Sequence, residues 1–502
     1  MIRGSFIINK ITIFYIYISN MLKKSITYRF FEMLGKYFER LSRNSLILSF
    51  FSNNWDTYLK TENSMFVNGT KQFLSNVSSN IENTNSKVLT AVKDSFIVNI
   101  ANENMLLIFV YLLLFLIPLA PTMILAFIAM VCIVLYIFNV VMGRIKLNKP
   151  SLLTCFIAVF LICYIASTFM SYDVRKAMQT MLIFITFAFM TFIISEIINN
   201  KKRLNAVINL VLFSGMIVSF YGIYQYFTGV HMDAAWIDTK TFSDISIRVY
   251  STFSNPNVLG EYLIVIASLA IGMLWKSDNV KLKLFYLAQV LIAIICLFMT
   301  NSRGSMVGLF IAIAIFIILA EKRLIIFGVV AMLALPFIMP QSIWSRIMSI
   351  ASMSDSSSLY RISIYKASIN MIRDFVITGI GVGSFNLVYP IYSFNAAYAY
   401  HSHNIFLQVF IEMGIIGFSV FVGIIILYIQ KMYYGVRNSL NKNRYIGAVI
   451  LGGFVGFLIQ GFADYLWFDY RIILLFWMIV GLGIATVKIN AERKVGLENG
   501  EN

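Results

Sequence analysis

Histidine offers the clearest acid–base chemistry in this sequence. His231, His401 and His403 are the only histidines among its 502 residues. Because the unperturbed pKa of imidazole lies close to neutral pH, histidine is the obvious candidate for a general base. His403 stands just before a long apolar segment, where Asn404 or Ser402 can cap the predicted helix. The positive end of that helix disfavours an imidazolium, so we expect a neutral His403 that can accept a proton.

Two further predicted helix starts carry residues suited to anions. Asn255, a proline and Asn257 open a helix near 257, and Ser302 and Arg303 open one near 303. Helix starts have free backbone N–H groups and partial positive charge. With Arg248 and Arg303 they would form an anion site, and a diphosphate suits it because a guanidinium binds phosphate oxygens bidentately.

The sequence gives no pattern for a metal or a nucleotide. His401 and His403 would form a metal pair, but no carboxylate or cysteine lies near them in the sequence. All four cysteines lie in apolar stretches without C-x-x-C spacing, which argues against a zinc site and a disulfide framework. The glycines at 379–383 fit neither a dinucleotide fingerprint nor a P-loop, and no DxD-like pair is present. We predict no metal and no cofactor.

The elements that must position these residues are membrane helices. The chain is 59% hydrophobic and 13% charged, against roughly 25% charged residues in soluble domains. Apolar stretches of about 17 to 25 residues can each cross a hydrocarbon core of about 30 Å. The predicted fold class is therefore all-α, polytopic, with about twelve transmembrane helices. They are expected near 105–121, 123–142, 152–170, 177–198, 204–226, 257–275, 282–300, 303–320, 323–340, 404–430, 444–464 and 470–487.

Charge in the connecting loops predicts the orientation. Lysines and arginines cluster in alternate loops, near 144–149, 201–203, 276–283, 322–323 and 431–444. By the positive-inside rule these loops face the cytoplasm together with both termini. The histidines and the three helix starts then face outside. The net charge of +17 is explained by this orientation and by anionic lipid, and we expect no nucleic-acid partner.

The predicted domains are a polar N-terminal region, a membrane domain and a short tail. Residues 1–104 differ in composition from the membrane domain, 105–487, and residues 488–502 form a cytoplasmic tail. Within 1–104 we expect a basic amphipathic helix on the membrane surface at 26–41, and Met21 is an alternative start.

Long exterior loops are the expected location of function. Two are predicted, at 227–256 and 341–403, and the second contains amphipathic helical spacing after Arg361.

Four ordered motifs lie between about residues 245 and 420. They are Arg248-Val-Tyr-Ser-Thr-Phe-Ser-Asn-Pro-Asn257; Asn301-Ser-Arg-Gly304; Tyr360-Arg361 with Gly379-Ile-Gly-Val-Gly383; and His403-Asn404 followed by Gly414 and Gly417. In this order and in a twelve-helix frame, they resemble the signatures of the bacterial O-antigen ligase and O-antigen polymerase family of membrane glycosyltransferases.

The resemblance implies transfer of a glycan from an undecaprenyl diphosphate carrier to a hydroxyl of a glycan or lipid-glycan acceptor, without metal or nucleotide. Carried over by motif, Arg248 and Arg303 would hold the diphosphate with help from Arg361, and His403 would activate the acceptor. Asp464 lies at the predicted outer end of the penultimate helix, where the family often has a carboxylate. An arginine partner for it is one possibility.

Several alternatives stay open at the level of sequence. The motifs do not separate a ligase, which attaches a finished glycan, from a polymerase, which joins repeat units. A transporter or flippase for a lipid-linked glycan is the alternative class. A flippase should line a membrane-spanning cavity with charge, whereas the predicted spans contain few ionisable residues besides Glu261 and Glu412 near outer helix ends. This favours an enzyme.

Overall fold

The computed structural model describes residues 100–145, 151–229, 248–325, 356–393, 398–439 and 442–498, with a few isolated positions elsewhere. Ten of the described helices are long and apolar enough to cross a membrane. No strand occurs in these ranges. The predicted all-α, polytopic membrane fold is confirmed.

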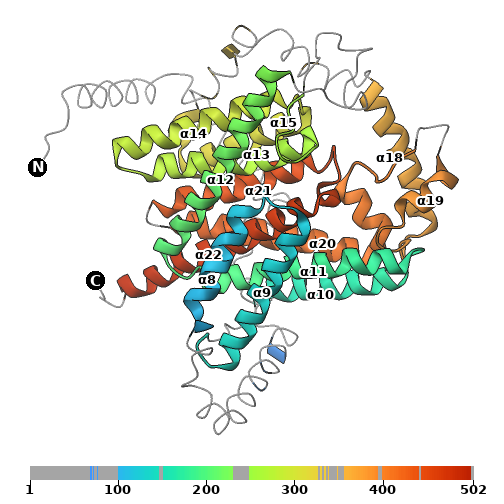
Figure 1. Cartoon of the computed structure of the whole chain (residues 1–502), viewed down its shortest axis with the longest axis horizontal. Helices are drawn as coiled ribbons and strands as arrows, with labels where there is room; N and C mark the ends of the chain where they lie inside the picture. Colours follow the sequence, from blue (N-terminus) through green and yellow to red (C-terminus); the bar gives the residue numbers. More distant parts are fainter. Residues whose placement is uncertain are drawn as a thin grey trace, which may run out of the picture. The chain divides into compact units, whose positions relative to one another are not determined.

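The observed helices follow the predicted spans within a few residues at most ends (Figure 1). In chain order they are α8 (Glu103–Leu116), α9 (Thr122–Val141), α10 (Leu152–Phe169), α11 (Val174–Ile197), α12 (Lys201–Thr228), α13 (Pro256–Lys276), α14 (Val280–Met299), α15 (Arg303–Ala320), α18 (Ser356–Asp374), α19 (Phe385–Tyr392), α20 (Ile405–Arg437), α21 (Asn443–Gln460) and α22 (Tyr470–Glu498). α8 is shorter than a usual span. The helix predicted near 323–340 and the one predicted at 26–41 lie largely or wholly outside the described residues.

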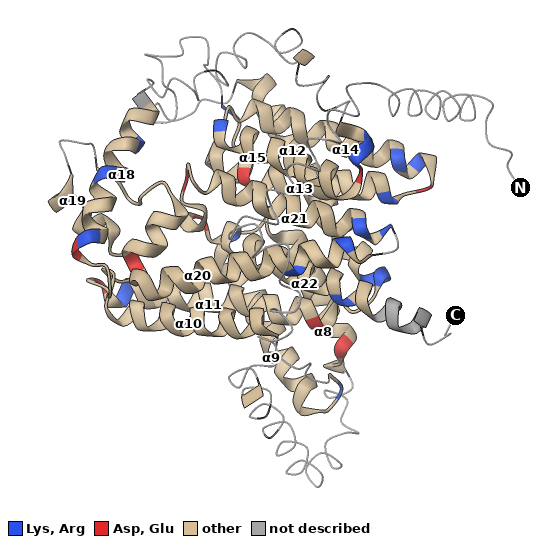
Figure 2. Cartoon of the chain, turned by 180° about the vertical axis from the view of Figure 1, so that it is seen from behind, with Lys and Arg blue, Asp and Glu red and all other residues tan. Residues whose placement is uncertain are grey.

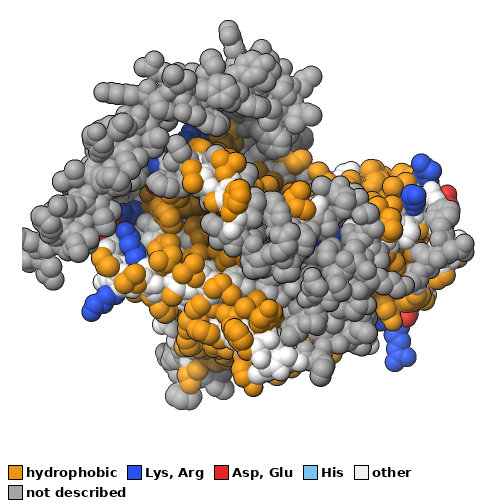
Figure 3. Space-filling model, turned by 90° about the horizontal axis from the view of Figure 1, so that it is seen from above, with side chains coloured by type: hydrophobic (Ala, Val, Ile, Leu, Met, Phe, Trp, Pro, Cys, Tyr) orange, Lys and Arg blue, Asp and Glu red, His pale blue; other side chains and the backbone are white. Residues whose placement is uncertain are grey.

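Helices α13, α21 and α22 form the interior of the membrane domain. The apolar windows of α13 and α22 are each 89% buried, whereas that of α14 is 33% buried. On α9, at the surface, Met123 and Phe127 are 75% and 69% exposed. Hydrophobic side chains likewise spread over the visible described surface in Figure 3. Apolar surface of this extent is expected where helices contact lipid.

Small residues bring α15 against α21. Gly308 and Ala312 on α15 face Gly452 and Gly456 on α21, each pair being spaced by four residues. A Cβ added at Gly456 would lie 2.2 Å from the carbonyl oxygen of Gly308, so the backbones meet where a side chain cannot fit. Such small-residue pairs are how membrane helices approach closely. This packing fixes the start of α15 beside the end of α21, where the candidate site lies.

The basic loops meet at one end of the helices. Lys276 donates to the side chain of Asn205, Lys442 pairs with Asp278, and Arg444 donates to the carbonyl of Ala320. In Figure 2 the ribbon positions of Lys and Arg gather at this end, beyond the labels of α14 and α22. Helices α18 and α19 lie on the opposite side of the bundle from the C-terminus (Figure 1). Which end faces the cytoplasm stays a prediction.

The amphipathic helix predicted after Arg361 is α18. Its apolar residues Ile364, Ala367 and Met371 recur at helical spacing and are fully buried. They form a second hydrophobic cluster with residues of the following loop and α19, among them Ile380. The helix is therefore packed on the rest of the chain.

The glycine loop after α18 docks onto a break in α20. Gly414 has φ of 64° and interrupts the helix. The N–H groups of Ile380 and Gly381 then donate to carbonyls of residues 411 and 412, at 2.8 and 3.0 Å. The Glu412 carboxylate accepts the Gly383 N–H at 3.0 Å. The third and fourth sequence motifs thus meet in one junction that holds α18 over the start of α20.

This junction predicts unequal effects of two alanine substitutions. Gly379→Ala would place a Cβ 2.3 Å from the Glu412 carbonyl oxygen, at a φ of +68°, and we expect a loss of roughly 3 kcal/mol. Gly383→Ala is the matched control, because its φ is +73° but nothing lies within 4 Å, so only the left-handed cost of about 1 kcal/mol applies. Thermal unfolding of the two variants in detergent would measure this. Equal midpoints would contradict the close-approach argument.

Candidate active site

A cavity of about 320 Å³ gathers the three arginines singled out in the sequence. Arg248 precedes α13, Arg303 is the first residue of α15, and Arg361 lies on α18. The lining residues are Arg248, Asn257, Asn301, Ser302, Arg303, Gly304, Val307, Ser357, Ser358, Arg361, Ile362, Tyr365, Ile459, Gln460, Phe462 and Ala463. Three guanidinium groups in one cavity make a strongly positive site for an anion.

The segment that carries Arg248 is anchored by two other helices. Gln225 of α12 accepts the Ser251 N–H at 2.7 Å. Arg471 of α22 donates to the carbonyls of residues 252 and 253, at 2.9 and 3.4 Å. Arg248 itself is 8% exposed, and its Nε donates to the Thr300 carbonyl at 3.0 Å. The guanidinium is thus held at a fixed place at the cavity wall.

The other two arginines are oriented by serines of α18. Arg303 donates to Ser358 Oγ at 3.3 Å, and Arg361 Nη1 donates to Ser357 Oγ at 3.1 Å. Within the described part of the chain, Arg361 Nε is buried and has no hydrogen-bond partner. A buried N–H without a partner costs free energy, and an anion in the cavity is a suitable acceptor for it.

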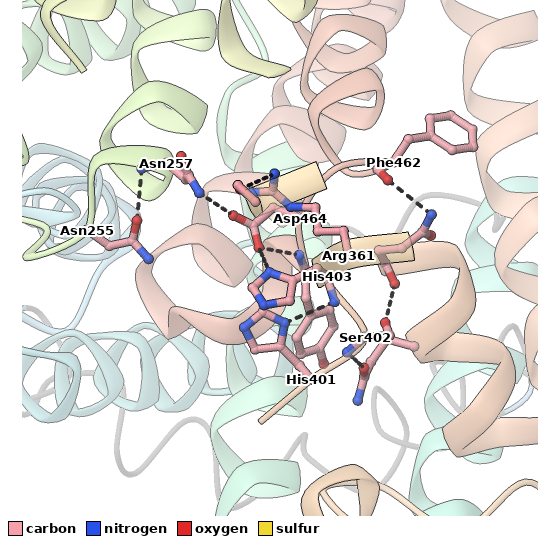
Figure 4. A network of polar contacts seen from close by, with 12 residues as sticks. Asn255, Asn257, Arg361, His401, Ser402, His403, Phe462 and Asp464 are labelled. Atoms are coloured by element: carbon pink, nitrogen blue, oxygen red, sulfur yellow. Dashed lines mark hydrogen bonds and ion pairs between the residues drawn. The ribbon is translucent and has the colours of Figure 1, made fainter. Parts of the chain in front are cut away.

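His403 lies next to this cavity and is paired with Asp464 (Figure 4). His403 Nδ1 is 3.2 Å from Asp464 Oδ1. The other carboxylate oxygen accepts from Asn257 Nδ2 at 2.9 Å. Burial alone would raise the pKa of Asp464, but the hydrogen bond with His403 and the charge of Arg361 hold that pKa below its ordinary value. An ionised Asp464 places the proton on Nδ1 of His403 and leaves Nε2 able to accept one.

Asp464 corrects one expectation and completes a cluster that the sequence did not reveal. Its hydrogen-bonding side-chain partners are His403 and Asn257, not an arginine. No carboxylate lies near His401 and His403 in the sequence, but the fold brings Asp464 to them from 61 residues beyond His403. Ligand atoms of the three residues all lie within 4.8 Å of one another, a set that could hold a metal ion.

His401 is held in its neutral form beside His403. Burial is the largest cause that lowers the pKa of His401, to about 3. Its Nδ1 accepts the backbone N–H of His403 at 3.2 Å, and the two rings are 4.2 Å apart. His401 therefore serves to fix the loop, and it cannot donate a proton at neutral pH. His231 lies outside the described residues.

The predicted helix caps are partly confirmed. Asn255 accepts the Asn257 N–H at 2.8 Å at the start of α13, and Asn404 caps α20 through two backbone N–H groups. Ser302 occupies the cap position of α15 without a capping bond, and its hydroxyl accepts from Ser305 instead. Ser402 is not the cap of α20, because its hydroxyl donates to the Asn404 carbonyl. The starts of α13, α15 and α20 do lie together around the cavity and the imidazole.

Left-handed backbone conformations concentrate at this site. Among the described residues, four non-glycine residues have φ between 50° and 59°: Ser251, Ser254, Asn301 and His403. All four belong to the motifs around the cavity and the imidazole. Such conformations cost about 1 to 3 kcal/mol each and cluster at functional sites, so they support a functional role for these loops.

Several residues of the site escaped the sequence analysis. Tyr365 lines the cavity, and its hydroxyl lies 3.0 Å from the His403 carbonyl and 2.8 Å from that of Phe462. Gln460 also lines the cavity, and its Oε1 would lie 1.9 Å from a Cβ at Gly304. Tyr365 follows Arg361 by one helical turn on α18, a spacing that could have indicated it. Gln460 has no such signal, since α21 meets α15 only in the folded chain.

These features define a multi-pass membrane protein with an arginine-lined cavity beside a histidine–carboxylate pair. A family model described as O-antigen ligase matches residues 288–422, which include Arg303, Arg361 and His403. Over these residues the chain is similar to the O-antigen ligase family, the resemblance that its motifs predicted. Comparison with curated proteins finds no similar sequence. The similarity supports a membrane protein of glycan processing.

Proposed function

We propose that this chain transfers a glycan from an undecaprenyl diphosphate carrier to an acceptor hydroxyl at the outer face of a bacterial membrane. The observation that carries the proposal is the meeting of Arg248, Arg303 and Arg361 in one cavity next to the His403–Asp464 pair. The cavity supplies positive charge for a diphosphate, and the pair supplies a base. Similarity to this family supports a lipid-linked glycan as the substrate class.

The proposed reaction mainly requires the protein to position the two substrates and to stabilise charge on the leaving group. In the proposed step the acceptor oxygen forms a bond to the anomeric carbon while the bond from that carbon to the diphosphate breaks. His403 Nε2 takes the hydroxyl proton, and the diphosphate leaves with the electron pair. The arginines stabilise the charge that develops on the leaving group, and binding both substrates supplies proximity.

Asp464 would support His403 before and after proton transfer. It fixes the ring orientation through Nδ1, and its negative charge stabilises the imidazolium that forms, as in other histidine–carboxylate pairs. The loop behind the imidazole is held by the Tyr365 hydroxyl and by Asn404, whose Nδ2 donates to the Phe462 carbonyl at 3.1 Å. A base held in this way does not have to be reoriented in the transition state.

We place the basic end of the bundle and both termini in the cytoplasm. The support is the gathering of Lys276, Lys442 and Arg444 at one end and of the candidate site at the opposite ends of α13, α15 and α21. A site at the outer face would meet a glycan that has already crossed the membrane on its lipid carrier.

The ligase and the polymerase differ in their products. Mass spectrometry of surface glycans from a strain lacking this chain separates them: accumulated single repeats indicate a polymerase, and accumulated long lipid-linked chains indicate a ligase.

A flippase is the remaining alternative. It is disfavoured by the position of the three cavity arginines, His401 and His403 at one end of the helices, since a flippase must offer polar contacts across the whole membrane.

Removing the base should abolish transfer without unfolding the chain. Because His403 has φ of 50°, His403→Asn is preferred to His403→Ala: asparagine tolerates this conformation but cannot act as the base. We expect transfer from a defined lipid-linked donor to fall about 10²- to 10⁴-fold.

Arg303→Lys should weaken donor binding roughly 10- to 100-fold, because a point charge cannot replace a guanidinium that binds two phosphate oxygens at once. Full activity of His403→Asn, or unchanged donor affinity of Arg303→Lys, would refute the assigned roles.

Transfer should not require a metal ion, although His401, His403 and Asp464 lie close enough to hold one. Nδ1 of each imidazole is already engaged, one by the carboxylate and one by a backbone N–H. We expect EDTA to leave the transfer rate unchanged and the purified protein to contain less than one metal ion per chain by elemental mass spectrometry. Loss of activity with EDTA and recovery with a divalent ion would overturn the metal-independent mechanism.

A further inference from the structure

A continuous chain of side-chain hydrogen bonds joins the anion cavity to the imidazole. Arg248 Nη2 donates to Asn257 Oδ1 at 3.0 Å. Asn257 Nδ2 donates to Asp464 Oδ2 at 2.9 Å, and Asp464 Oδ1 is 3.2 Å from His403 Nδ1. Figure 4 shows Asn257, Asp464 and His403 in this order. Asn257 stands between the group that would meet the diphosphate and the carboxylate that orients the base.

An amide is the side chain that this position requires. Its oxygen accepts from a guanidinium on one side, and its nitrogen donates to a carboxylate on the other. An aspartate here would keep the first bond but would set a second negative charge against Asp464. A hydrophobic residue would leave both charged partners without this contact.

Asn257 is also fixed in place by its helix. It is 8% exposed, and it follows Pro256, the first residue of α13. Its backbone N–H donates to Asn255 Oδ1 at 2.8 Å. The backbone of Asn257 is thus held at the start of a helix that is almost entirely buried, so its amide stays within reach of both Arg248 and Asp464 and links the two charged groups.

We propose that Asn257 is a positioning residue that couples occupancy of the arginine cavity by a lipid diphosphate to the orientation of Asp464 and His403. The inference rests on the proposed function. The amide passes no proton. When diphosphate oxygens bind the guanidinium of Arg248, the hydrogen bond from Arg248 to Asn257 changes, and with it the bond from Asn257 to Asp464. The Asp464 carboxylate then holds the imidazole of His403 in the orientation that accepts a proton from the acceptor. Acceptor activation would then depend on a bound donor, which limits reaction with water in the empty site.

The chain is well suited to a direct measurement of this coupling, because it contains three histidines in total. Histidine-selective isotope labelling would give three imidazole signals by NMR, and the His403→Asn variant would assign the one of interest. The probe is undecaprenyl diphosphate, titrated into the full-length protein in lipid nanodiscs. We expect the His403 signal of the wild type to shift on saturation.

Asn257→Ala is the test variant, and Asn139→Ala is its matched control. Asn139 is a buried asparagine of α9 whose amide donates to the Ala101 and Leu135 carbonyls, so the control removes a buried amide away from the site. We expect Asn139→Ala to keep the His403 response, and Asn257→Ala to bind the lipid while losing that response. In transfer assays kcat of Asn257→Ala should fall about 5- to 150-fold, the usual range of coupling between sites, with a smaller change in donor KM.

Asn257→Asp keeps the result decisive if Asn257→Ala does not fold or does not bind the lipid, because aspartate still offers an acceptor to Arg248. A full His403 response in either Asn257 variant, or no response in a wild type that binds the lipid, would overturn the coupling. Failure of the wild type to bind undecaprenyl diphosphate would instead refute the proposed function, so the two failures are distinguishable.

Discussion

A carboxylate stays ionised inside a protein only where hydrogen-bond donors and positive charges surround it, and Asp464 meets this condition at the centre of the structure. It is 7% exposed and accepts from Asn257, from His403 and from the backbone N–H of Tyr465. Those donors come from three different parts of the chain. Satisfying one buried charge therefore requires that the start of α13, the loop before α20 and the turn after α21 come together.

Membrane helices supply the frame in which this is possible. Small residues at Gly308 and Gly456 let α15 and α21 approach until their backbones touch, which brings Arg303 beside Gln460. The break at Gly414 lets α20 accept the glycine loop of residues 379–383, which brings α18 and Arg361 over the same cavity. Different helix contacts thus position the arginines of the cavity. The anion site forms only when all of these contacts are made.

Much of this arrangement could be predicted from the sequence. The lengths of the apolar stretches predicted the membrane spans, because in lipid the backbone N–H and C=O groups must hydrogen-bond within the helix. Asn255 and Asn404 were predicted correctly as helix caps. Composition and spacing also placed Arg248, Arg303 and His403 on one face. The partner of Asp464 could not be predicted, because Asn257 lies 207 residues away in sequence and no periodicity relates the two. For the same reason the sequence offered an arginine as one possible partner of Asp464 and did not reveal that this carboxylate lies beside His401.

The proposed function requires that the arginine cavity and the imidazole face the side opposite to the basic loops. Single cysteines at two exposed positions test this most directly: Tyr400→Cys, beside His401, and Asp278→Cys, among the basic loops. Three of the four native cysteines are buried, which limits background labelling. With a membrane-impermeant thiol reagent on intact cells, the proposed function predicts labelling at position 400 and, at position 278, labelling only after permeabilisation. Labelling of both from one side, or of position 278 alone, would contradict it.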